Sequence, residues 1–382
     1  MMKGVTMNSI YRWSVLCLAL GFAIFCVSCT NDNDPSTSSG QANDDDSGVS
    51  DDDAADDDNA TDDDTQSDDD TSDDDQADDD IVDDDLVDDD TTDDDTTDDD
   101  SSPDDDDNAA WSKMSSGTLS QLNTVWGTSP TDVFASGLSG VILHYDGVSW
   151  SKMPSGTFKS LPGLWGSSGS DVFAVGQNGV ILHYDGDTWS AMDSGTTHNL
   201  MSVWGTSSSS VFAVGYGAIL LYDGETWSPM SHPGLFALAR VWGASSTDVF
   251  AVGVGGMILH FDGDTWSDMA SGVAEDLMGV WGASSSEVFA ASVMGRILRF
   301  DGSIWTVGPS GTTNALLCIW GTSSSDVFAV GDGGVIQHYD GTAWSAMDSG
   351  TENILYGVWG ASPLDVFAVG TGGTILHYGP QH

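Results

Sequence analysis

LPGLWGSSGSDVFAVGQNGVILHYDGDTWSAM, residues Leu161 to Met192, contains four short apolar stretches separated by turns of Ser, Gly and Asp. The stretches are rich in Val, Phe, Ile, Tyr and Trp, which favour strands, and glycines bound them where tight turns are needed. The segment therefore predicts a four-stranded antiparallel meander, whose strands we call A to D in chain order.

This segment recurs seven times, with a spacing of 39 residues and once of 38. One tryptophan in strand A and one in strand D mark every copy. These tryptophans are Trp111, Trp126, Trp150, Trp165, Trp189, Trp204, Trp227, Trp242, Trp266, Trp281, Trp305, Trp320, Trp344 and Trp359. A period near 40 with four strands in each copy is typical of a β-propeller. We expect an all-β, seven-bladed β-propeller over residues 109–382, with the tryptophans as packing residues between blades.

The two ends of the repeat array predict how the ring closes. The last copy ends at His382 without a strand D, whereas an unpartnered strand D, from Ala110 to Met114, precedes the first copy. The N-terminal strand should complete the seventh blade, because this arrangement removes two exposed sheet edges at once.

The turn between strands C and D carries a motif known from other propellers. Tyr184-Asp185-Gly186-Asp187-Thr188-Trp189 resembles the Asp-box of BNR-repeat and sialidase-like propellers, although their pattern places one residue between Asp and Gly. The resemblance implies that the Asp carboxylate accepts backbone N–H groups within the hairpin. The whole pattern, VWG…DVFAVG…GVILHYDG…W, is also similar to repeats of bacterial propellers grouped with photosystem II stability factors. The aspartate recurs as Asp146, Asp185, Asp223, Asp262, Asp301 and Asp340.

Residues 1–28 have the features of an export signal. Lys3 and Arg12 flank the start, and the apolar run from Val15 to Val27 is too short for a permanent membrane span. Val27-Ser28-Cys29 resembles the lipobox of bacterial lipoproteins, which implies that Cys29 becomes the lipidated first residue of the mature chain. The alternative is an ordinary cleaved signal followed by an unmodified cysteine. In the lipoprotein family, Thr30 after the cysteine implies an outer-membrane lipoprotein of the bacterial cell envelope, facing the periplasm or the exterior.

Residues 29–108 are dominated by aspartate. Between Asp32 and Asp107 there are 39 aspartates and no Lys or Arg, which predicts a disordered, extended linker. Calcium binding is the alternative, but no EF-hand pattern is present. The propeller itself has 22 acidic residues against six basic ones, so we expect no nucleic-acid partner.

Two patterns raise the question of a catalytic or metal site. Histidine recurs at one position of strand C, and either a metal site or a structural role would fit. Because strand C lies third from the axis, these side chains should be far apart, so we expect no metal and no cofactor. The sialidase resemblance implies a carboxylate clamp of three arginines around the axis, whereas Arg296 and Arg299 lie on one strand. The recurring histidines are His144, His183, His260, His338 and His377.

The copies differ most in the third to fifth repeats, in the D-to-A and B-to-C loops. Unlike recurrent residues, these positions are available for contacts, although neutral drift would also produce such variation. The candidate binding residues are Tyr216, Leu235, Phe236, Arg240, Glu275, Asp276, Val293 and Met294.

The expected function is a non-enzymatic, extracytoplasmic binding or scaffolding module, monomeric and displayed on a lipid-anchored polyaspartate tether. Its partner would be an envelope or extracellular protein, or a polysaccharide, and it would contact the membrane only through the lipid anchor. A glycan-binding or glycan-hydrolysing sialidase-like propeller is the alternative.

Overall fold

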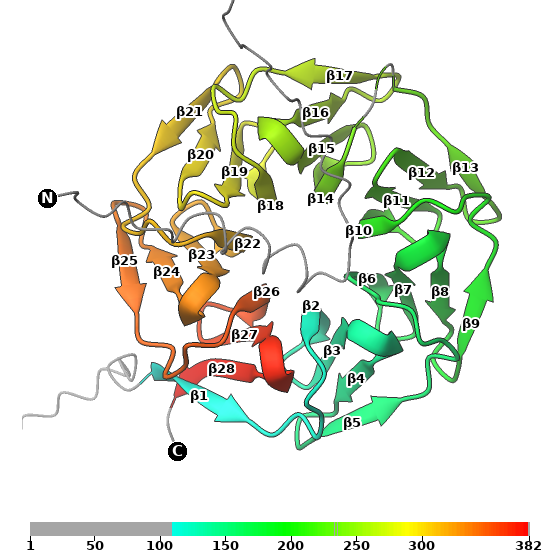
Figure 1. Cartoon of the computed structure of the whole chain (residues 1–382), viewed down its shortest axis with the longest axis horizontal. Helices are drawn as coiled ribbons and strands as arrows, with labels where there is room; N and C mark the ends of the chain where they lie inside the picture. Colours follow the sequence, from blue (N-terminus) through cyan, green and yellow to red (C-terminus); the bar gives the residue numbers. More distant parts are fainter. Residues whose placement is uncertain (1–108, 233, 235, 381–382) are drawn as a thin grey trace, which may run out of the picture. The chain divides into compact units, whose positions relative to one another are not determined.

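The computed structural model describes residues 109–232, 234 and 236–380. These residues form 28 strands in seven four-stranded sheets arranged around a central axis (Figure 1). The prediction of an all-β, seven-bladed propeller is confirmed. The signal peptide, Cys29 and the acidic linker lie outside the described residues and stay predictions.

Each blade is an antiparallel meander with strand A innermost and strand D outermost (Figure 1). The strands are, blade by blade, β2 (Leu122–Ser129), β3 (Asp132–Gly137), β4 (Ile142–Tyr145) and β5 (Trp150–Met153); β6 (Gly163–Ser168), β7 (Asp171–Val175), β8 (Ile181–Tyr184) and β9 (Trp189–Met192); β10 (Leu200–Ser207), β11 (Ser210–Gly215), β12 (Ala218–Tyr222) and β13 (Trp227–Pro229); β14 (Leu238–Ser245), β15 (Asp248–Gly253), β16 (Ile258–Phe261) and β17 (Trp266–Met269); β18 (Leu277–Ser284), β19 (Glu287–Ser292), β20 (Ile297–Phe300) and β21 (Trp305–Gly308); β22 (Leu316–Ser323), β23 (Asp326–Gly331), β24 (Ile336–Tyr339) and β25 (Trp344–Met347); β26 (Leu355–Ser362), β27 (Asp365–Gly370), β28 (Ile375–Pro380) and β1 (Ala109–Met114).

The ring closes through the N-terminal strand, as the repeat ends predict. Strand β1 pairs with β28 in antiparallel register, from Ala109 opposite Pro380 to Met114 opposite Ile375. The Trp111 ring lies 5.4 Å from the ring of Tyr378 within the blade and 6.3 Å, edge-on, from that of Phe328 in the sixth blade. The first strand of the propeller is therefore the outermost strand of its last blade.

Tryptophans of strand A join neighbouring blades, and they explain the glycine that follows each of them. A Cβ atom on Gly166 would lie 2.6 Å from Cη2 of Trp126 in the preceding blade. The contact continues across the closure, where a Cβ on Gly127 would lie 2.8 Å from Cη2 of Trp359. Distances below 3 Å leave no room for a side chain, so the Trp-Gly pair is a steric unit of interblade packing.

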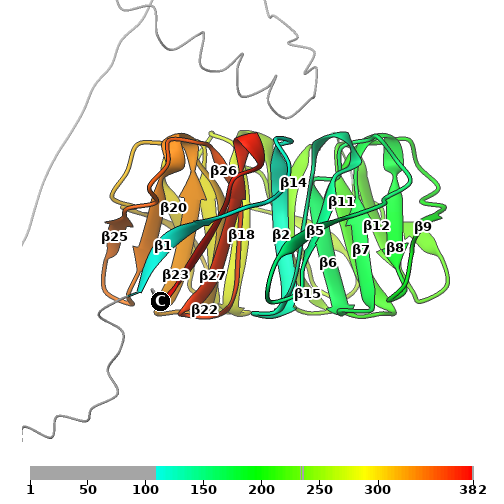
Figure 2. The same ribbon diagram turned by 90° about the horizontal axis from the view of Figure 1, so that it is seen from below.

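The D-to-A loops and the B-to-C turns lie on one face of the ring (Figure 2), which we call the D–A face. In five blades the B-to-C turn is a short 3-10 turn: η2 (Leu138–Gly140), η3 (Gln177–Gly179), η4 (Val254–Gly256), η5 (Asp332–Gly334) and η6 (Thr371–Gly373). The A-to-B and C-to-D turns lie on the opposite face. Within the described ranges, no helix is long and apolar enough to cross a membrane.

Candidate binding surface

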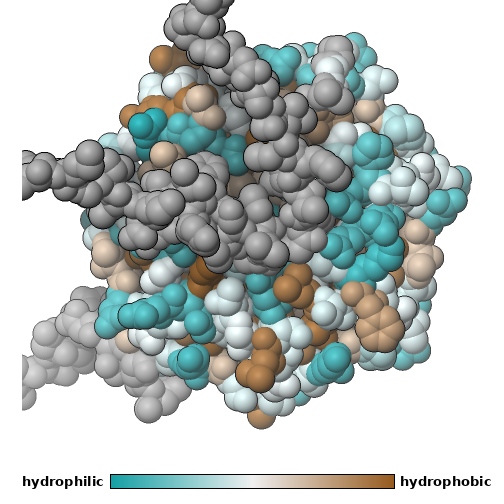
Figure 3. Space-filling view, viewed as in Figure 1, coloured by the Kyte–Doolittle hydropathy of each residue, from teal (hydrophilic) through white to brown (hydrophobic). Residues whose placement is uncertain are grey.

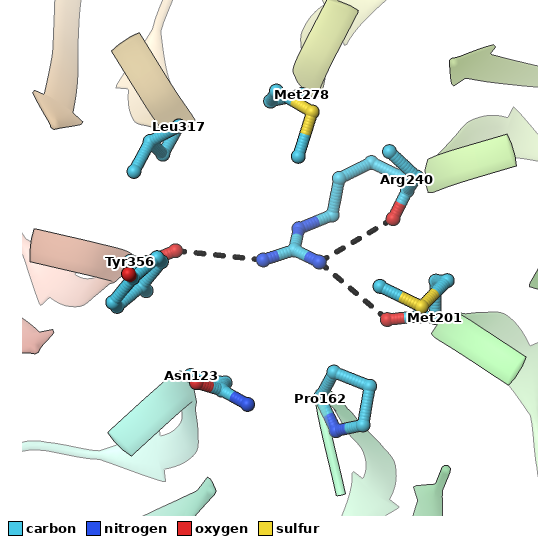
Figure 4. A pocket seen from close by; sticks show the side chains of 8 residues that line it. Asn123, Pro162, Met201, Arg240, Met278, Leu317 and Tyr356 are labelled. Atoms are coloured by element: carbon cyan, nitrogen blue, oxygen red, sulfur yellow. Dashed lines mark hydrogen bonds between the residues drawn. The ribbon is translucent and has the colours of Figure 1, made fainter. Parts of the chain in front are cut away.

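The central channel is filled where the innermost strands begin. In six blades the register between strands A and B shifts near this point, as between Leu238 and Arg240 in β14. The cavity left among the side chains around the axis has a volume of about 20 Å³ (Figure 4), which is room for about one water molecule. No substrate can enter the channel at this level. The side chains around the axis, one from each blade, are those of Asn123, Pro162, Met201, Ala239, Met278, Leu317 and Tyr356.

Arg240, a candidate binding residue, extends across this part of the channel (Figure 4). Its Nη1 donates to the carbonyl oxygens of Ala239, at 3.3 Å, and Met201, at 3.5 Å. Its Nη2 donates to the carbonyl oxygen of Tyr356 at 3.4 Å, on the seventh blade. The guanidinium therefore links the third, fourth and seventh blades.

Tyr356 is one of seven channel residues that are absent from the sequence-based candidates. The side chain is 3% exposed, and its hydroxyl has no hydrogen-bond partner among the described residues. Burial, with a smaller contribution from the Asp332 carboxylate, raises the pKa of Tyr356 to about 12. The phenol therefore stays protonated at neutral pH and cannot act there as a base.

The recurring histidines pair with the aspartate that begins strand B of the same blade. His144 Nε2 lies 2.7 Å from Asp132 Oδ1, and the His144 ring is 4.5 Å from the ring of Phe134. Equivalent contacts of 2.6 to 3.3 Å join His183, His260, His338 and His377 to Asp171, Asp248, Asp326 and Asp365. Each pair lies within its own blade. Among the described residues, no three His, Cys, Asp or Glu side chains are grouped to hold a metal ion.

The two blades that lack the histidine change both partners together. In the fifth blade Arg299 pairs with Glu287 and lies 5.6 Å above the ring of Phe289. In the third blade Leu221 lies opposite Phe212 and strand B begins with Ser210, so neither ionisable group is present. Paired replacement indicates a structural contact between strands rather than a catalytic dyad.

The Asp-box aspartates also act within their own turns. Oδ1 of Asp185 accepts the backbone N–H groups of Asp187, at 3.0 Å, and Thr188, at 2.8 Å. These hydrogen bonds, that of Thr188 first, lower the pKa of Asp185. The other five turns show the same pattern. The hydrogen bonding that the Asp-box resemblance implies is therefore present.

The three arginines of the described chain do not converge. Arg240 lies in the channel, Arg299 pairs with Glu287 within its blade, and Arg296 Nη1 lies 3.2 Å from Glu275 Oε1 on the D–A face. A carboxylate clamp of the sialidase type needs all three around one site, which this arrangement does not provide.

Four candidate binding residues lie together on the D–A face between the fourth and fifth blades. The Asp276 carbonyl accepts the N–H of Val293 at 3.0 Å, and its carboxylate accepts the N–H of Gly255 at 2.8 Å. Glu275 is the neighbour that pairs with Arg296. Met294, beside Val293, is 54% exposed. We call Glu275, Asp276, Val293, Met294 and Arg296 the blade 4–5 cluster.

Tyr216 and Phe236 meet at the boundary of the third and fourth blades. Tyr216 forms an isolated β-bridge with Ala237, and its carbonyl lies 2.7 Å from His198 Nδ1. Phe236 is half-buried, packs against the core and contacts the His232 ring edge-on at 5.5 Å. Leu235 lies outside the described residues. Substituting Phe236 would therefore change packing as well as any contact with a partner.

The candidate binding residues do not include the most exposed apolar side chains of the D–A face. Leu119 is 88% exposed and Phe158 is 93% exposed, at equivalent positions of neighbouring D-to-A loops. The later Ser-Gly-x-x loops carry Thr197, Ala274, Thr313 and Glu352 there. Figure 3 shows this face, where apolar residues in brown lie among polar ones in teal. The variation of this loop position between copies is the sequence signal for the pair.

The ring of seven blades and the filled channel define the class of this protein, a seven-bladed β-propeller. Its structure is similar to that of YCF48 from Cyanidioschyzon merolae, with a TM-score of 0.60, 16% identity, and coverage of 72% of this chain and 100% of that one. A structure of YCF48 bound to D1 peptide gives a TM-score of 0.61 at 17% identity, covering 71% of this chain and 95% of that one. The WD40 β-propeller domain of Doa1 gives 0.61 at 11% identity, covering 72% and 97%. No protein family and no curated protein matches the sequence.

Proposed function

We propose that this chain is a non-enzymatic module that binds or scaffolds a protein partner through its D–A face. The observation that carries the proposal is the exposure of Leu119 and Phe158 at the tips of neighbouring loops. Large apolar side chains are costly to leave in water, and a patch of them with a polar surround is the usual composition of an interface.

Three further observations support the proposal. The blade 4–5 cluster combines the exposed Met294 with the Glu275–Arg296 ion pair on the same face. The recurrent His–Asp pairs and turn aspartates are engaged within the blades, so the variable loops are the part of the ring left for a partner. YCF48, a propeller of similar fold, has been solved bound to D1 peptide, which favours a polypeptide as the ligand class here.

The proposal includes the display of this module in the bacterial cell envelope. Cys29 would carry the lipid, and residues 30–108, with their many aspartates, would separate a monomeric propeller from the membrane. Mass spectrometry of the mature protein tests the anchor. We expect a lipidated N-terminal Cys29, and an unmodified N-terminus at another residue would contradict the tether while leaving the D–A face untested by that result.

The binding role is tested by capturing envelope proteins and polysaccharides on the immobilised full-length chain. The variants are the double change Leu119→Ser with Phe158→Ser, and separately Met294→Ser. Val148→Ser is the matched control, since Val148 is an apolar side chain 86% exposed in a C-to-D turn on the opposite face.

We expect the first two variants to lose a captured protein at least tenfold, whereas the control should capture as wild type does. Equal loss in all three would indicate a general effect on the fold. Retention in both D–A variants, or capture of polysaccharide alone, would contradict the proposal.

A further inference from the structure

The charged side chains are distributed unevenly around the ring. Residues 109–160, which comprise β1 and the first blade with its loops, contain three of the six basic residues of the propeller and two of its 22 acidic ones. The remaining blades carry the other acidic residues against three arginines. The basic residues of the first group are Lys113, Lys152 and Lys159. This sector is therefore the part of an acidic propeller that has no excess of negative charge.

The lysines of this sector have no carboxylate partner within the described chain. Among the described residues, the lysines and arginines that form ion pairs with carboxylates are two arginines of the fifth blade. The two aspartates of the sector lie on the face opposite to the D–A face and are engaged there. Asp132 pairs with a histidine of its own blade, and Asp146 accepts two backbone N–H groups of its turn. The lysine charges are thus left for an external carboxylate.

The η2 turn joins the two D-to-A loops that flank the first blade into one surface. The N–H of Leu138 in this turn donates to the Gln121 carbonyl of the first loop at 3.0 Å. At the other end of the turn, the Gly140 carbonyl accepts a hydrogen bond from Ser155 Oγ of the second loop at 2.6 Å. The two loops are those that carry the most exposed apolar side chains of the D–A face. A single partner segment can therefore contact both loop tips.

Each of these loops brings an apolar side chain and a lysine together. A groove with a volume of about 440 Å³ is lined by both Lys113 and Leu119, and by residues 372–374 of the seventh blade. Both side chains are exposed. On the second loop, Lys159 directly follows Phe158. We call Lys113, Leu119, Phe158 and Lys159 the first-blade patch.

Acidic side chains mark the limits of the first-blade patch on the D–A face. Glu352 precedes Asn353, which lines the groove at its seventh-blade side. Asp193 lines a second depression together with Ser155 and Thr157, at the second-blade side. A partner carboxylate seated between these limits meets lysines, and more distant acids are screened over about 8 Å at physiological ionic strength.

We propose that the first-blade patch binds a partner segment that carries both acidic and large apolar side chains. Its carboxylates lie against Lys113 and Lys159, and its apolar side chains cover Leu119 and Phe158. Complementary charge selects such a segment over a basic or purely apolar one, and burial of the apolar side chains stabilises the complex. The inference rests on the proposed function and names the chemical class of its protein partner.

Two other acidic or anionic occupants fit the patch less well. Residues 30–108 of this chain are rich in carboxylates but contain no aromatic residue. An anionic bilayer would repel a chain with a net charge of −53, and a bilayer surface does not fill a groove. A segment of another protein supplies carboxylates, apolar side chains and a shape that enters the groove.

The test uses a synthetic peptide with blocked ends in which aspartates alternate with tryptophan and leucine. One control peptide has asparagine in place of every aspartate, and another has serine in place of the tryptophan and leucine. Isothermal titration calorimetry at physiological ionic strength measures their binding to the full-length chain. Co-sedimentation with phosphatidylglycerol vesicles measures binding to an anionic bilayer.

The variant that tests the charges is the double change Lys113→Gln with Lys159→Gln. Its matched control is Val148→Glu with Ile304→Glu, which makes the same change in net charge. Val148 and Ile304 are 86% and 60% exposed, in C-to-D turns on the opposite face.

We expect saturable binding of the acidic, apolar peptide to wild type and to the Val148→Glu, Ile304→Glu control. Binding to the lysine double variant should be about fivefold weaker, because two exposed ion pairs are lost. The asparagine peptide should bind wild type with a similar loss, and the serine peptide should not bind measurably. Absence of binding to wild type, equal binding of the asparagine peptide, unchanged binding to the lysine variant, or binding of vesicles in place of the peptide would overturn the proposal.

Capture of envelope proteins separates this inference from the proposed function on which it rests. If Leu119→Ser with Phe158→Ser loses a captured protein while the lysine double variant retains it fully, the D–A face binds a partner but the acidic class is wrong. If both variants capture as wild type does, the proposed function fails together with the inference.

Discussion

The residue after each strand A tryptophan is a glycine because the tryptophan ring of the neighbouring blade leaves no room for a side chain there. At Gly205, a Cβ atom would lie 2.6 Å from the Ser210 carbonyl oxygen and 2.8 Å from Cη2 of Trp165. Both neighbours are held, one by the strand pairing of the blade and the other by interblade packing. The residue type is therefore dictated by close approach and not by an unusual backbone angle.

Gly205→Ala should consequently destabilise the propeller. Forcing a methyl group into this contact requires the tryptophan or the strand to shift, which costs about 1–3 kcal/mol of unfolding free energy. Urea unfolding measures the change. Gly308→Ala is the matched control, because the nearest atom to its Cβ is 3.6 Å away. Equal stability of the two variants would contradict the steric account.

At the scale of the element, each C-to-D hairpin is held by one aspartate. Oδ1 of Asp185 accepts two backbone N–H groups of its turn, and the Tyr184 hydroxyl donates to the Gly186 carbonyl at 2.9 Å. The Trp189 ring stacks on the Tyr184 ring at 5.3 Å. The turn, the aromatic pair and the strand register are thus specified locally, in every copy that has the motif.

This arrangement predicts how stability depends on pH. The N–H groups of Thr188 and Asp187 lower the pKa of Asp185 in the folded state below the ordinary 3.8. The unfolded chain therefore binds the proton more readily, so the stabilisation is present above pH 3.8 and is lost as pH falls through the folded pKa. We expect the melting temperature of Asp185→Asn to fall less between pH 6 and pH 3 than that of wild type. Asp187→Asn, in the same turn, should fall as wild type does, and an Asp185→Asn profile identical to wild type would refute the assignment.

The strands could be predicted from the sequence because their patterns are local and repeated, and the closure followed from the unmatched ends. The His–Asp pairs were missed, because His144 and Asp132 lie on different strands and both recur. In the fifth blade both positions change together, to Arg299 and Glu287, and this joint change is the signal in the sequence that the two positions are in contact. Arg240 was predicted to belong to the binding surface of the loops. The direction of its side chain depends on the register shift between Leu238 and Arg240 in β14, and no pattern in the sequence indicates that shift. The contacts of the blade 4–5 cluster depend on loop conformations, which the repeat does not specify.

At the scale of the molecule, stability depends on a ring without an open blade. Strand β1 completes the seventh sheet, and its side chains serve two interfaces. Trp111 packs with the cluster between the sixth and seventh blades, and Met114 packs with the cluster between the seventh and first. Removing this strand would expose both clusters and leave the edge of β28 unpaired.

Deletion of residues 109–115 should therefore lower the melting temperature sharply. The loss of a partly buried tryptophan and a partly buried methionine suggests about 3–5 kcal/mol of unfolding free energy. Differential scanning calorimetry measures the effect. Deletion of residues 104–108, which directly precede the strand, is the control and should leave the melt unchanged. An unchanged melt after removal of residues 109–115 would be incompatible with a clasped ring.

The pairing of β1 with β28 also affects the order in which the protein can be made. Ser112 Oγ donates to the His377 carbonyl, and the two residues are 265 positions apart in the chain. At a synthesis rate of about 5–20 residues per second, β1 exists for on the order of tens of seconds before its partner is translated. A nascent or prematurely terminated chain has an open ring with unpaired edges, which are surfaces that chaperones and proteases can recognise. The ring can therefore close only after β28 has been synthesised.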